Sequence, residues 1–397
     1  MTRVGHARLT SPKRKRGGST STAPSDDTRT ASRLAAWFRE NQRPMPWRTP
    51  LGVPRNPYHA LVSEAMLQQT QVSRVIDHFT RFIARFPTLA ALASAPEREV
   101  LALWSGLGYY RRAKSLHAAA RTIVADFNGS VPDRASELQK LPGIGRYTAG
   151  SIASIVFGEP APIVDGNVMR VLLRLNGRDV NPAAKPTVAW AWNRAESLVR
   201  AAAPADVPSF NEGLMELGAT VCLPPPSAPR CDVCPLRGDC RAFAKGKQDR
   251  IPRAKAVRTP STVHCAAIVI TDTRGRILIE QRPPTGMWAS MWQCPTLEAV
   301  PRRGGADVPS ASEIAAFARM RGCTGPVSRA GAFTHQTTHR TLHFTIYTAS
   351  AATCLRKAAG RVWRTPTALA DLGLSNAAKR VLALVRALGT PTLRVGR

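Results

Sequence analysis

The 397-residue chain has no long apolar run, no apolar segment behind its N-terminal charges, and little negative charge. A membrane-spanning helix needs about 18 or more consecutive apolar residues, so the sequence predicts no membrane span. A secretory signal needs an apolar stretch after its basic start, so none is expected. We therefore expect a cytoplasmic protein, although the basic run at 12–16 leaves a nuclear address open.

Acidic residues are scarce relative to basic ones. The chain has 26 Asp and Glu against 56 Lys and Arg, a formal net charge of +30. Such a charge attracts polyanions and speeds association with them. A basic tail or a generally basic proteome would give the same count, so charge alone does not establish a nucleic-acid partner.

The cysteines are not spaced along the sequence as in a disulfide-rich protein. Half of the eight gather within twenty residues, with intervals of eight, two and five residues: Cys222, Cys231, Cys234 and Cys240. This pattern fits a reducing compartment and one metal site. Four clustered thiolates can enclose an iron–sulfur cluster or a zinc ion, and the spacing alone leaves both open.

The composition changes along the chain and divides it into four segments. Residues 1–31 lack apolar periodicity, so we expect a disordered basic tail. Residues 32–243 carry helical patterns and predict an all-α domain. The basic, proline-containing stretch 244–261 is interpreted as a linker. Short β-like runs and a closing helix over 376–387 predict an α+β domain at 262–390.

A glycine-rich hairpin links two predicted helices at Leu141–Gly150. Gly143 and Gly145 permit a tight turn with exposed N–H groups, and the next helix points its N-terminus the same way, which together suit a phosphate. A lone Gly-x-Gly is more often an ordinary turn. Here the run Pro-Gly-x-Gly-Arg-Tyr-Thr-Ala-Gly resembles the helix-hairpin-helix of base-excision DNA glycosylases, whose pattern places an Asp beyond the hairpin, as Asp165 does.

Further motifs narrow the resemblance. The hairpin and the cysteine loop together resemble the endonuclease III superfamily, whose members carry a [4Fe-4S] cluster. Residues 46–48, 63–72 and 106–110 look like the MutY family of adenine DNA glycosylases. The resemblance extends over residues 32–387. It implies a monomer that acts on double-stranded DNA, extrudes an adenine mispaired with 8-oxoguanine or guanine, and hydrolyses its N-glycosidic bond.

The resemblance assigns the catalytic roles to four residues. Glu64 matches the general acid that protonates adenine. Asp165 matches the carboxylate that stabilises the oxocarbenium ion, although an Asp before a helix could simply be an N-cap. Asn167 matches a residue that orients this carboxylate. Tyr147 stands where bifunctional relatives carry a Schiff-base lysine, and because a phenol cannot form the imine, we expect a glycosylase without efficient strand cleavage.

Locally, Asn56-Pro57 reads as an N-cap followed by proline at N1, which opens a helix that we expect to run through Glu64 to Gln69. Apolar neighbours of Glu64 indicate a partly buried helix, which would raise the pKa of a carboxyl.

The resemblance also assigns DNA contacts. Gln69, Thr70 and Tyr109 match the family's contacts around 8-oxoguanine and its wedge into the duplex, and an aromatic wedge at a kinked step is physically reasonable. Arg48 is expected to be a phosphate clamp or a plain surface charge. The first cysteine gap departs from the family, because it has eight residues where six are usual.

The C-terminal half resembles the family's Nudix-like domain through Gln281–Trp288. Residues 298–327 contain too few acidic residues for a metal-dependent pyrophosphatase. In the family a Phe-Ser-His loop reads 8-oxoguanine. We favour Thr338 and His339 for this role over the rival Phe333–His335, which leaves Thr337 in place of the family's Phe.

Three alternatives stay open. One is a bifunctional pyrimidine glycosylase and lyase of the endonuclease III type, which Tyr147 disfavours. Another is a thymine-removing mismatch glycosylase, which can also carry Tyr there. The last is a non-catalytic iron–sulfur DNA-binding sensor, which the presence of both Glu64 and Asp165 disfavours.

Overall fold

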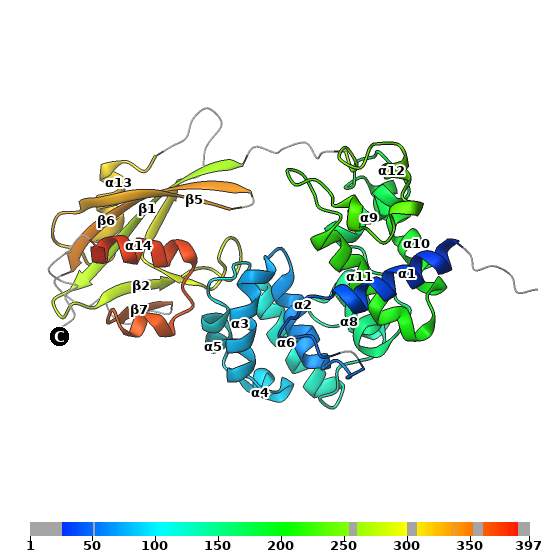
Figure 1. Cartoon of the computed structure of the whole chain (residues 1–397). Helices are drawn as coiled ribbons and strands as arrows, with labels where there is room; N and C mark the ends of the chain where they lie inside the picture. Colours follow the sequence, from blue (N-terminus) through cyan, green and yellow to red (C-terminus); the bar gives the residue numbers. More distant parts are fainter. Residues whose placement is uncertain are drawn as a thin grey trace, which may run out of the picture.

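The computed structural model describes residues 26–50, 52–253, 260–299, 308–337, 339–351 and 360–387. Within them a helical half is followed by a sheet with two helices (Figure 1). The expected all-α plus α+β organisation is therefore confirmed. The α-helices of the first half are α1 (Asp26–Asn41), α2 (Pro57–Leu67), α3 (Val72–Arg85), α4 (Leu89–Ser94), α5 (Glu97–Trp104), α6 (Arg111–Asp126), α7 (Ala135–Leu138), α8 (Arg146–Phe157), α9 (Gly166–Leu175), α10 (Lys185–Ala201), α11 (Val207–Thr220) and α12 (Arg241–Ala244).

The helical half has two apolar cores. One is built from residues between Tyr58 and Ala161, around the fully buried Trp104. The other joins α1 to residues from Ile163 to Ile251, around Phe210. Helices α2 and α8 belong to the first core, and α1, α9 and α11 to the second. Side chains from helices of both cores line the space between them.

Helix α2 begins as its sequence predicts. The Asn56 side chain accepts hydrogen bonds from the N–H groups of Tyr58 and His59, and Pro57 occupies the first turn. The helix ends at Leu67, two residues earlier than expected, because Gln68 leaves the helical conformation with ψ of 111° and Gln69 is left-handed with φ of 56°. A left-handed residue cannot continue a right-handed helix.

Two predicted boundaries were wrong. Helix α1 begins at Asp26, inside the segment 1–31 that we assigned to the tail, and Asp27 accepts hydrogen bonds from Arg194 and Ser197 of α10. Residues 1–25 lie outside the described part. The predicted linker 244–261 also begins too early, because Ile251 is buried in the second core and its carbonyl accepts a hydrogen bond from Arg174.

The C-terminal half is a mixed sheet covered on both faces. The strand order is β3-β2-β1-β6-β5, with β4 paired to β1 and β7 to β2. Helix α14 belongs to the core on one face and α13 to the core on the other, and they lie on opposite sides of the sheet in Figure 1. Strands β1 and β6 run parallel, from Ser261 opposite Arg340 to Asp272 opposite Ala351. The elements are β1 (Ser261–Asp272), β2 (Ile277–Gln281), β3 (Trp292–Gln293), β4 (Thr296–Ala299), α13 (Ala311–Arg319), β5 (Ser328–Gln336), β6 (Arg340–Ala351), β7 (Arg361–Arg364) and α14 (Asn376–Ala387).

The two halves touch through a small contact. Met291, from the C-terminal half, is fully buried in the first helical core. The Leu374 carbonyl accepts hydrogen bonds from the hydroxyls of Ser105 (2.9 Å) and Tyr110 (3.2 Å). The sheet domain is thereby fastened to the turn between α5 and α6.

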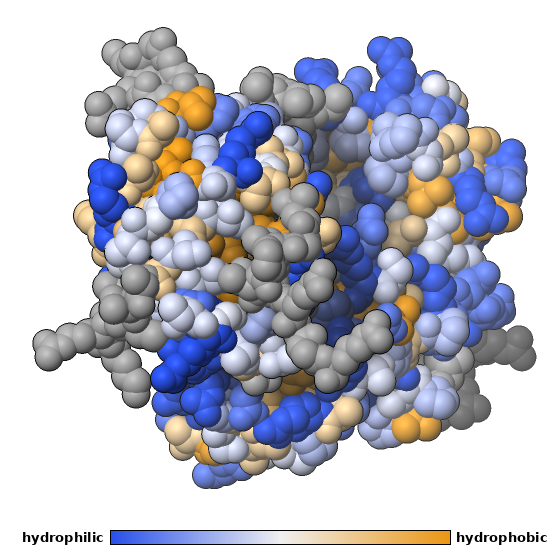
Figure 2. Space-filling view, turned by 90° about the vertical axis from the view of Figure 1, so that its left-hand side faces the viewer, coloured by the Kyte–Doolittle hydropathy of each residue, from blue (hydrophilic) through white to orange (hydrophobic). Residues whose placement is uncertain are grey.

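The described surface is mainly hydrophilic (Figure 2), as the charged composition and the lack of long apolar runs lead one to expect. Seen from the side of the sheet domain, most of the described surface is hydrophilic, and hydrophobic residues appear in small separate groups (Figure 2). No helix among the described residues is both long and apolar enough to span a bilayer.

Candidate active site

A pocket of about 560 Å³ opens between the two helical cores. Seven of the residues that the sequence singled out line it: Arg48, Glu64, Gln69, Thr70, Tyr147, Asp165 and Asn167. Its volume falls in the range of small-molecule sites. Residues that are up to 119 positions apart in the sequence therefore share one cavity.

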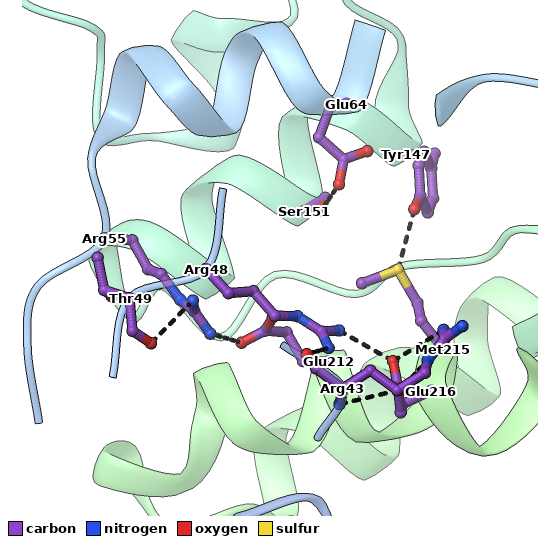
Figure 3. Close-up of polar contacts among 10 residues, drawn as sticks. All are labelled: Arg43, Arg48, Thr49, Arg55, Glu64, Tyr147, Ser151, Glu212, Met215 and Glu216. Carbon is purple, nitrogen blue, oxygen red and sulfur yellow. Dashed lines mark hydrogen bonds and ion pairs between the residues drawn. The ribbon is translucent and has the colours of Figure 1, made fainter. Parts of the chain in front are cut away.

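Glu64 lies on α2 and points into the pocket (Figure 3). The Ser151 hydroxyl, from α8, donates a hydrogen bond to Glu64 Oε1 at 2.8 Å. Burial raises the pKa of Glu64 to about 7; the Ser151 bond opposes this rise, and the nearby carboxylates of Asp165 and Glu212 add to it. The carboxyl is thus protonated in a large fraction of molecules at neutral pH.

Tyr147 stands beside Glu64 at the start of α8 (Figure 3). Its hydroxyl donates a hydrogen bond to Met215 Sδ at 3.0 Å. Burial raises the pKa of the phenol well above its usual range, and the charges of Glu64 and Asp165 raise it further. Tyr147 is therefore a neutral phenol under all ordinary conditions.

Asp165 occupies the N-cap of α9, so the simple structural reading of this residue is correct. Its Oδ1 accepts a hydrogen bond from the Val168 N–H (2.7 Å) and its Oδ2 one from the Asn167 amide (3.2 Å). Burial raises the pKa of Asp165, while these hydrogen bonds oppose the rise. Both oxygens are thus held in place while the carboxylate faces the pocket.

Asn167 is itself held by its neighbours. Its Oδ1 accepts a hydrogen bond from Arg170, which also binds the carbonyls of Gly218 and Cys222. A Cβ on Gly218 would stand 2.6 Å from the Asn167 Cβ, so only glycine allows α11 to approach α9 this closely.

An ion-pair network that the sequence did not predict forms the opposite side of the pocket (Figure 3). Arg48 pairs with both Glu212 and Glu216 at 3.0 Å, Arg55 pairs with Glu212, and Arg43 pairs with Glu216. Arg48 is not a plain surface charge, because its side chain is 11% exposed and pairs with two carboxylates. Its role as a phosphate clamp stays a prediction. Burial alone would raise the pKa of Glu216, but Arg43 and Arg48 hold it below its usual range.

The glycine hairpin lies outside this pocket, at the N-terminus of α8. Gly143 has φ of 76°, and a Cβ there would stand 2.3 Å from the Ser115 Cβ, so this position requires glycine. Gly145 caps α8 with an extended conformation that other residues could adopt, and no atom lies within 4 Å of where its Cβ would be. The described residues therefore leave space beside Gly145 at the start of α8. The unpaired N–H groups of a helix's first turn suit an anion in general.

Gln69, Thr70 and Tyr109 lie on two neighbouring turns. Gln69 is exposed and left-handed, and so is Tyr109, with φ of 48° and 46% exposure. A left-handed conformation at a residue other than glycine costs about 1 kcal/mol or more. The Arg112 side chain lies between the turns and donates to Thr70 Oγ1 and to the Gly108 carbonyl.

The four clustered cysteines line one small cavity of about 30 Å³ together with Arg174. Arg174 is buried, and its Nη1 donates to Cys222 Sγ at 3.2 Å, while its Nη2 has no hydrogen-bond partner among the described residues. Burial raises the pKa of Cys234 to about 12, and the neighbouring thiolates add to the rise. Within the described ranges, no three Cys, His, Asp or Glu side chains stand close enough to hold a single ion.

The unusually long first cysteine gap is absorbed locally. The Arg230 N–H donates to the Val221 carbonyl at 2.8 Å, so the loop closes at its base before Cys231. The two additional residues therefore extend the loop without separating the thiols.

The lesion-reading candidates fall at the β5–β6 connection. Thr338 lies outside the described residues, and His339 is exposed. The rival Phe333–His335 is inside β5, with Thr334 Oγ1 3.1 Å from His343 Nδ1 and His335 against the Trp288 ring. Burial lowers the pKa of His335, and the charge of Arg380 lowers it further. Thr337 bonds Arg340 across the turn.

Comparison with family models assigns both halves. Residues 62–196 match the HhH-GPD superfamily of base-excision DNA repair proteins, and residues 266–384 match the NUDIX domain. The first match contains Glu64, the glycine hairpin and Asp165. The second contains the whole sheet except its first residues.

Whole-chain comparison is more specific. An adenine DNA glycosylase of Buchnera aphidicola (subsp. Baizongia pistaciae) is 35% identical over 262 residues, which cover 65% of this chain and 71% of that protein. The chain belongs to the adenine DNA glycosylase family. The adenine DNA glycosylase of Rattus norvegicus is 38% identical over 315 residues, covering 68% of this chain and 60% of its own length. The chain thus spans about 60% of that longer relative.

A solved structure of a thermostable thymine-DNA glycosylase aligns with 55% of this chain and 98% of its own, at 27% identity and a TM-score of 0.48. The sequence comparisons with the adenine DNA glycosylases confirm the resemblance to that family stated from the motifs. The roles of individual residues remain predictions.

We predict that Glu64 makes stability depend on pH. Its pKa is higher in the folded protein, about 7, than the ordinary value of 4.5, so folded molecules bind more protons between these values and lose stability as the pH rises through them. The shift corresponds to ~3 kcal/mol above pH 7. Glu64→Gln should therefore raise the melting temperature more at pH 8 than at pH 4.5. The exposed Glu40→Gln serves as control, and an equal effect of Glu64→Gln at both pH values would contradict the prediction.

Proposed function

We propose that the protein is a monofunctional adenine DNA glycosylase of base-excision repair, which removes adenine mispaired with 8-oxoguanine or guanine from duplex DNA. The observation that carries the proposal is the pocket in which Glu64, with a pKa of about 7, shares one cavity with Asp165. One carboxyl able to donate a proton and a second carboxyl fixed in the same cavity are what hydrolysis of a glycosidic bond requires.

Glu64 acts as the general acid in this proposal. Ser151 donates to Glu64 Oε1, so the proton of the neutral acid resides on the other oxygen, which remains available to a bound base. Protonation of the departing adenine removes the need to expel an anion. The pKa near the ambient pH suits both donation and recovery of the proton.

Asp165 stabilises the positive charge that develops on the sugar. Two hydrogen bonds fix its oxygens, and α9 directs its N-terminus at the carboxylate, which favours the ionised form. Asn167 is a positioning residue, since it binds Asp165 on one side and Arg170 on the other. Tyr147 offers no amine, so the abasic product is released without an imine intermediate.

DNA binding follows from the surfaces beside the pocket. The N-terminus of α8 behind Gly145 binds a backbone phosphate, and Gln69, Thr70 and Tyr109 meet the distorted step of the duplex. The excess of 30 positive charges supplies non-specific attraction.

A single-turnover assay on a duplex with adenine opposite 8-oxoguanine tests the activity. Strand breaks should form after alkali treatment of the product and be nearly absent without it. The rate should decrease as the pH rises above about 7, because Glu64 loses its proton. Glu64→Gln should lower the rate by ~10²-fold or more while DNA still binds. Breaks without alkali would favour a lyase, release from a G:T duplex instead would favour a thymine glycosylase, and no release would favour the sensor.

We further propose that the four cysteines hold a [4Fe-4S] cluster, which supplies structure rather than chemistry to the reaction. The donor set fits, since four thiols line one cavity and the buried Arg174 guanidinium, with an unpartnered Nη2, offsets their negative charge. Purified protein should contain the iron and acid-labile sulfide of one such cluster per chain. Cys231→Ser should lower both contents and the affinity for DNA, and finding zinc in place of iron would contradict the proposal.

Lesion reading is proposed for Thr338 and His339 at the β5–β6 turn. His339 is exposed, whereas Thr334 already has a partner within the sheet. His339→Ala should reduce the preference for 8-oxoguanine over guanine opposite adenine by about fivefold, the equivalent of one hydrogen bond of ~1 kcal/mol. The matched variant Thr334→Ala should leave the preference unchanged. The opposite result for the two variants would assign lesion reading to Phe333–His335.

A further inference from the structure

Arg112 occupies a central position that neither the sequence motifs nor the proposed chemistry explains. It lies in the first turn of α6, and its guanidinium reaches the far end of α2. We propose that Arg112 is a positioning residue that locks the turn carrying Gln69 to the turn carrying Tyr109, so that both meet the duplex in one geometry and extrude the target base. This inference rests on the proposed function and deepens it.

The hydrogen bonds of Arg112 join two separate segments. Nη1 donates to the carbonyls of Ala65 (3.0 Å), Met66 (2.8 Å) and Gln68 (2.5 Å), at the C-terminal end of α2. Nη2 donates to Thr70 Oγ1 (3.0 Å) and to the carbonyls of Leu107 and Gly108 (3.3 Å each). One planar group therefore connects residues 65–70 to residues 107–108.

Aromatic rings complete the environment of the guanidinium. Its carbon lies 5.5 Å from the centre of the Trp104 ring and 5.4 Å from that of Tyr109. Both distances fall within cation–π range. The Tyr109 side chain, 46% exposed, is thus held from behind by the same group that satisfies the α2 carbonyls. A positive charge at a helix C-terminus is favourable in itself.

Both turns need such support because each contains a strained residue. Gln69 and Tyr109 have positive φ although neither is glycine. Such conformations persist only when the surrounding structure enforces them, and they concentrate at functional sites. Gln69 and Thr70 also line the pocket, and Glu64 directly precedes Ala65, the first of the residues whose carbonyls Arg112 binds. A displacement of these turns would reach the reacting base.

The Tyr109 turn is held from its other side by the sheet domain, through the bonds of Ser105 and Tyr110 to the Leu374 carbonyl. The turn thus has a fixed contact on each side. Arg112 differs from the Leu374 contact in that it also reaches the Gln69 turn, so its loss would remove a connection between the two turns that the Leu374 contact does not supply.

Lysine cannot replace Arg112 in this role. Its ammonium has three donors at one point, whereas the guanidinium distributes its donors over a rigid plane and stacks on aromatic rings. Arg112→Lys therefore retains the charge and removes the connection. The neighbouring Arg111 is exposed, so Arg111→Lys is a matched control for the same chemical change on the same helix turn.

The experiment measures base extrusion separately from chemistry. In a Glu64→Gln background, the duplex carries 2-aminopurine at the target position opposite 8-oxoguanine, and its fluorescence rises when it leaves the stack. Arg112→Lys should lower the fluorescence change by roughly tenfold or more, and in the Glu64 enzyme should lower single-turnover adenine release by a similar factor. Affinity for an undamaged duplex should remain close to that of the parent, and Arg111→Lys should resemble the parent throughout.

Two results would overturn the inference. Normal extrusion and release in Arg112→Lys would mean that the two turns keep their geometry without the guanidinium. A parallel loss of undamaged-duplex affinity and melting temperature, with no selective loss of extrusion, would make Arg112 a residue of the fold only. Failure of the proposed function looks different, since the parent enzyme itself would then release no adenine.

Discussion

The burial of carboxyl groups between two helical cores is the constraint on which the site depends. Glu64 has no cationic partner among its hydrogen bonds, so burial and neighbouring negative charge raise its pKa to about 7. A short distance away Glu212 and Glu216 are buried as well, but three arginines pair with them. Burial disfavours the charged form of each carboxyl. Without an arginine partner, Glu64 becomes a proton donor, whereas Glu212 and Glu216 remain charged in ion pairs on the other side of the pocket.

The sequence predicted the parts of the site that depend on local pattern. Glu64, the glycine hairpin and Asp165 belong to motifs of a few residues, and the Asn56 cap of α2 follows from side-chain chemistry next to the helix. The environment of Arg48 does not follow from local pattern. Its partners Glu212 and Glu216 are 164 and 168 positions away, so only the folded chain reveals that its charge is neutralised.

The wrongly predicted start of α1 and end of α2 also depend on contacts with residues far away in the sequence. The start of α1 looked like tail because its composition is polar, yet Asp27 binds Arg194 and Ser197 on α10 and so stabilises the helix end. The early end of α2 was missed because Gln and Thr are acceptable helix residues. A contact from α6, the Arg112 guanidinium, binds the carbonyls at that end, and no local propensity encodes it.

The distribution of charge also explains how a strongly basic protein can select a base rather than a phosphate. In the proposed function, the net charge of +30 draws the DNA backbone to the outer surface, where the described residues leave space beside Gly145 at the start of α8. The pocket is different, because its arginines are already paired and Asp165 adds negative charge. A phosphate entering it would be repelled and desolvated without a free cation to receive it. A neutral base meets no such barrier, so in the proposed reaction the pocket receives the extruded base while the backbone remains outside.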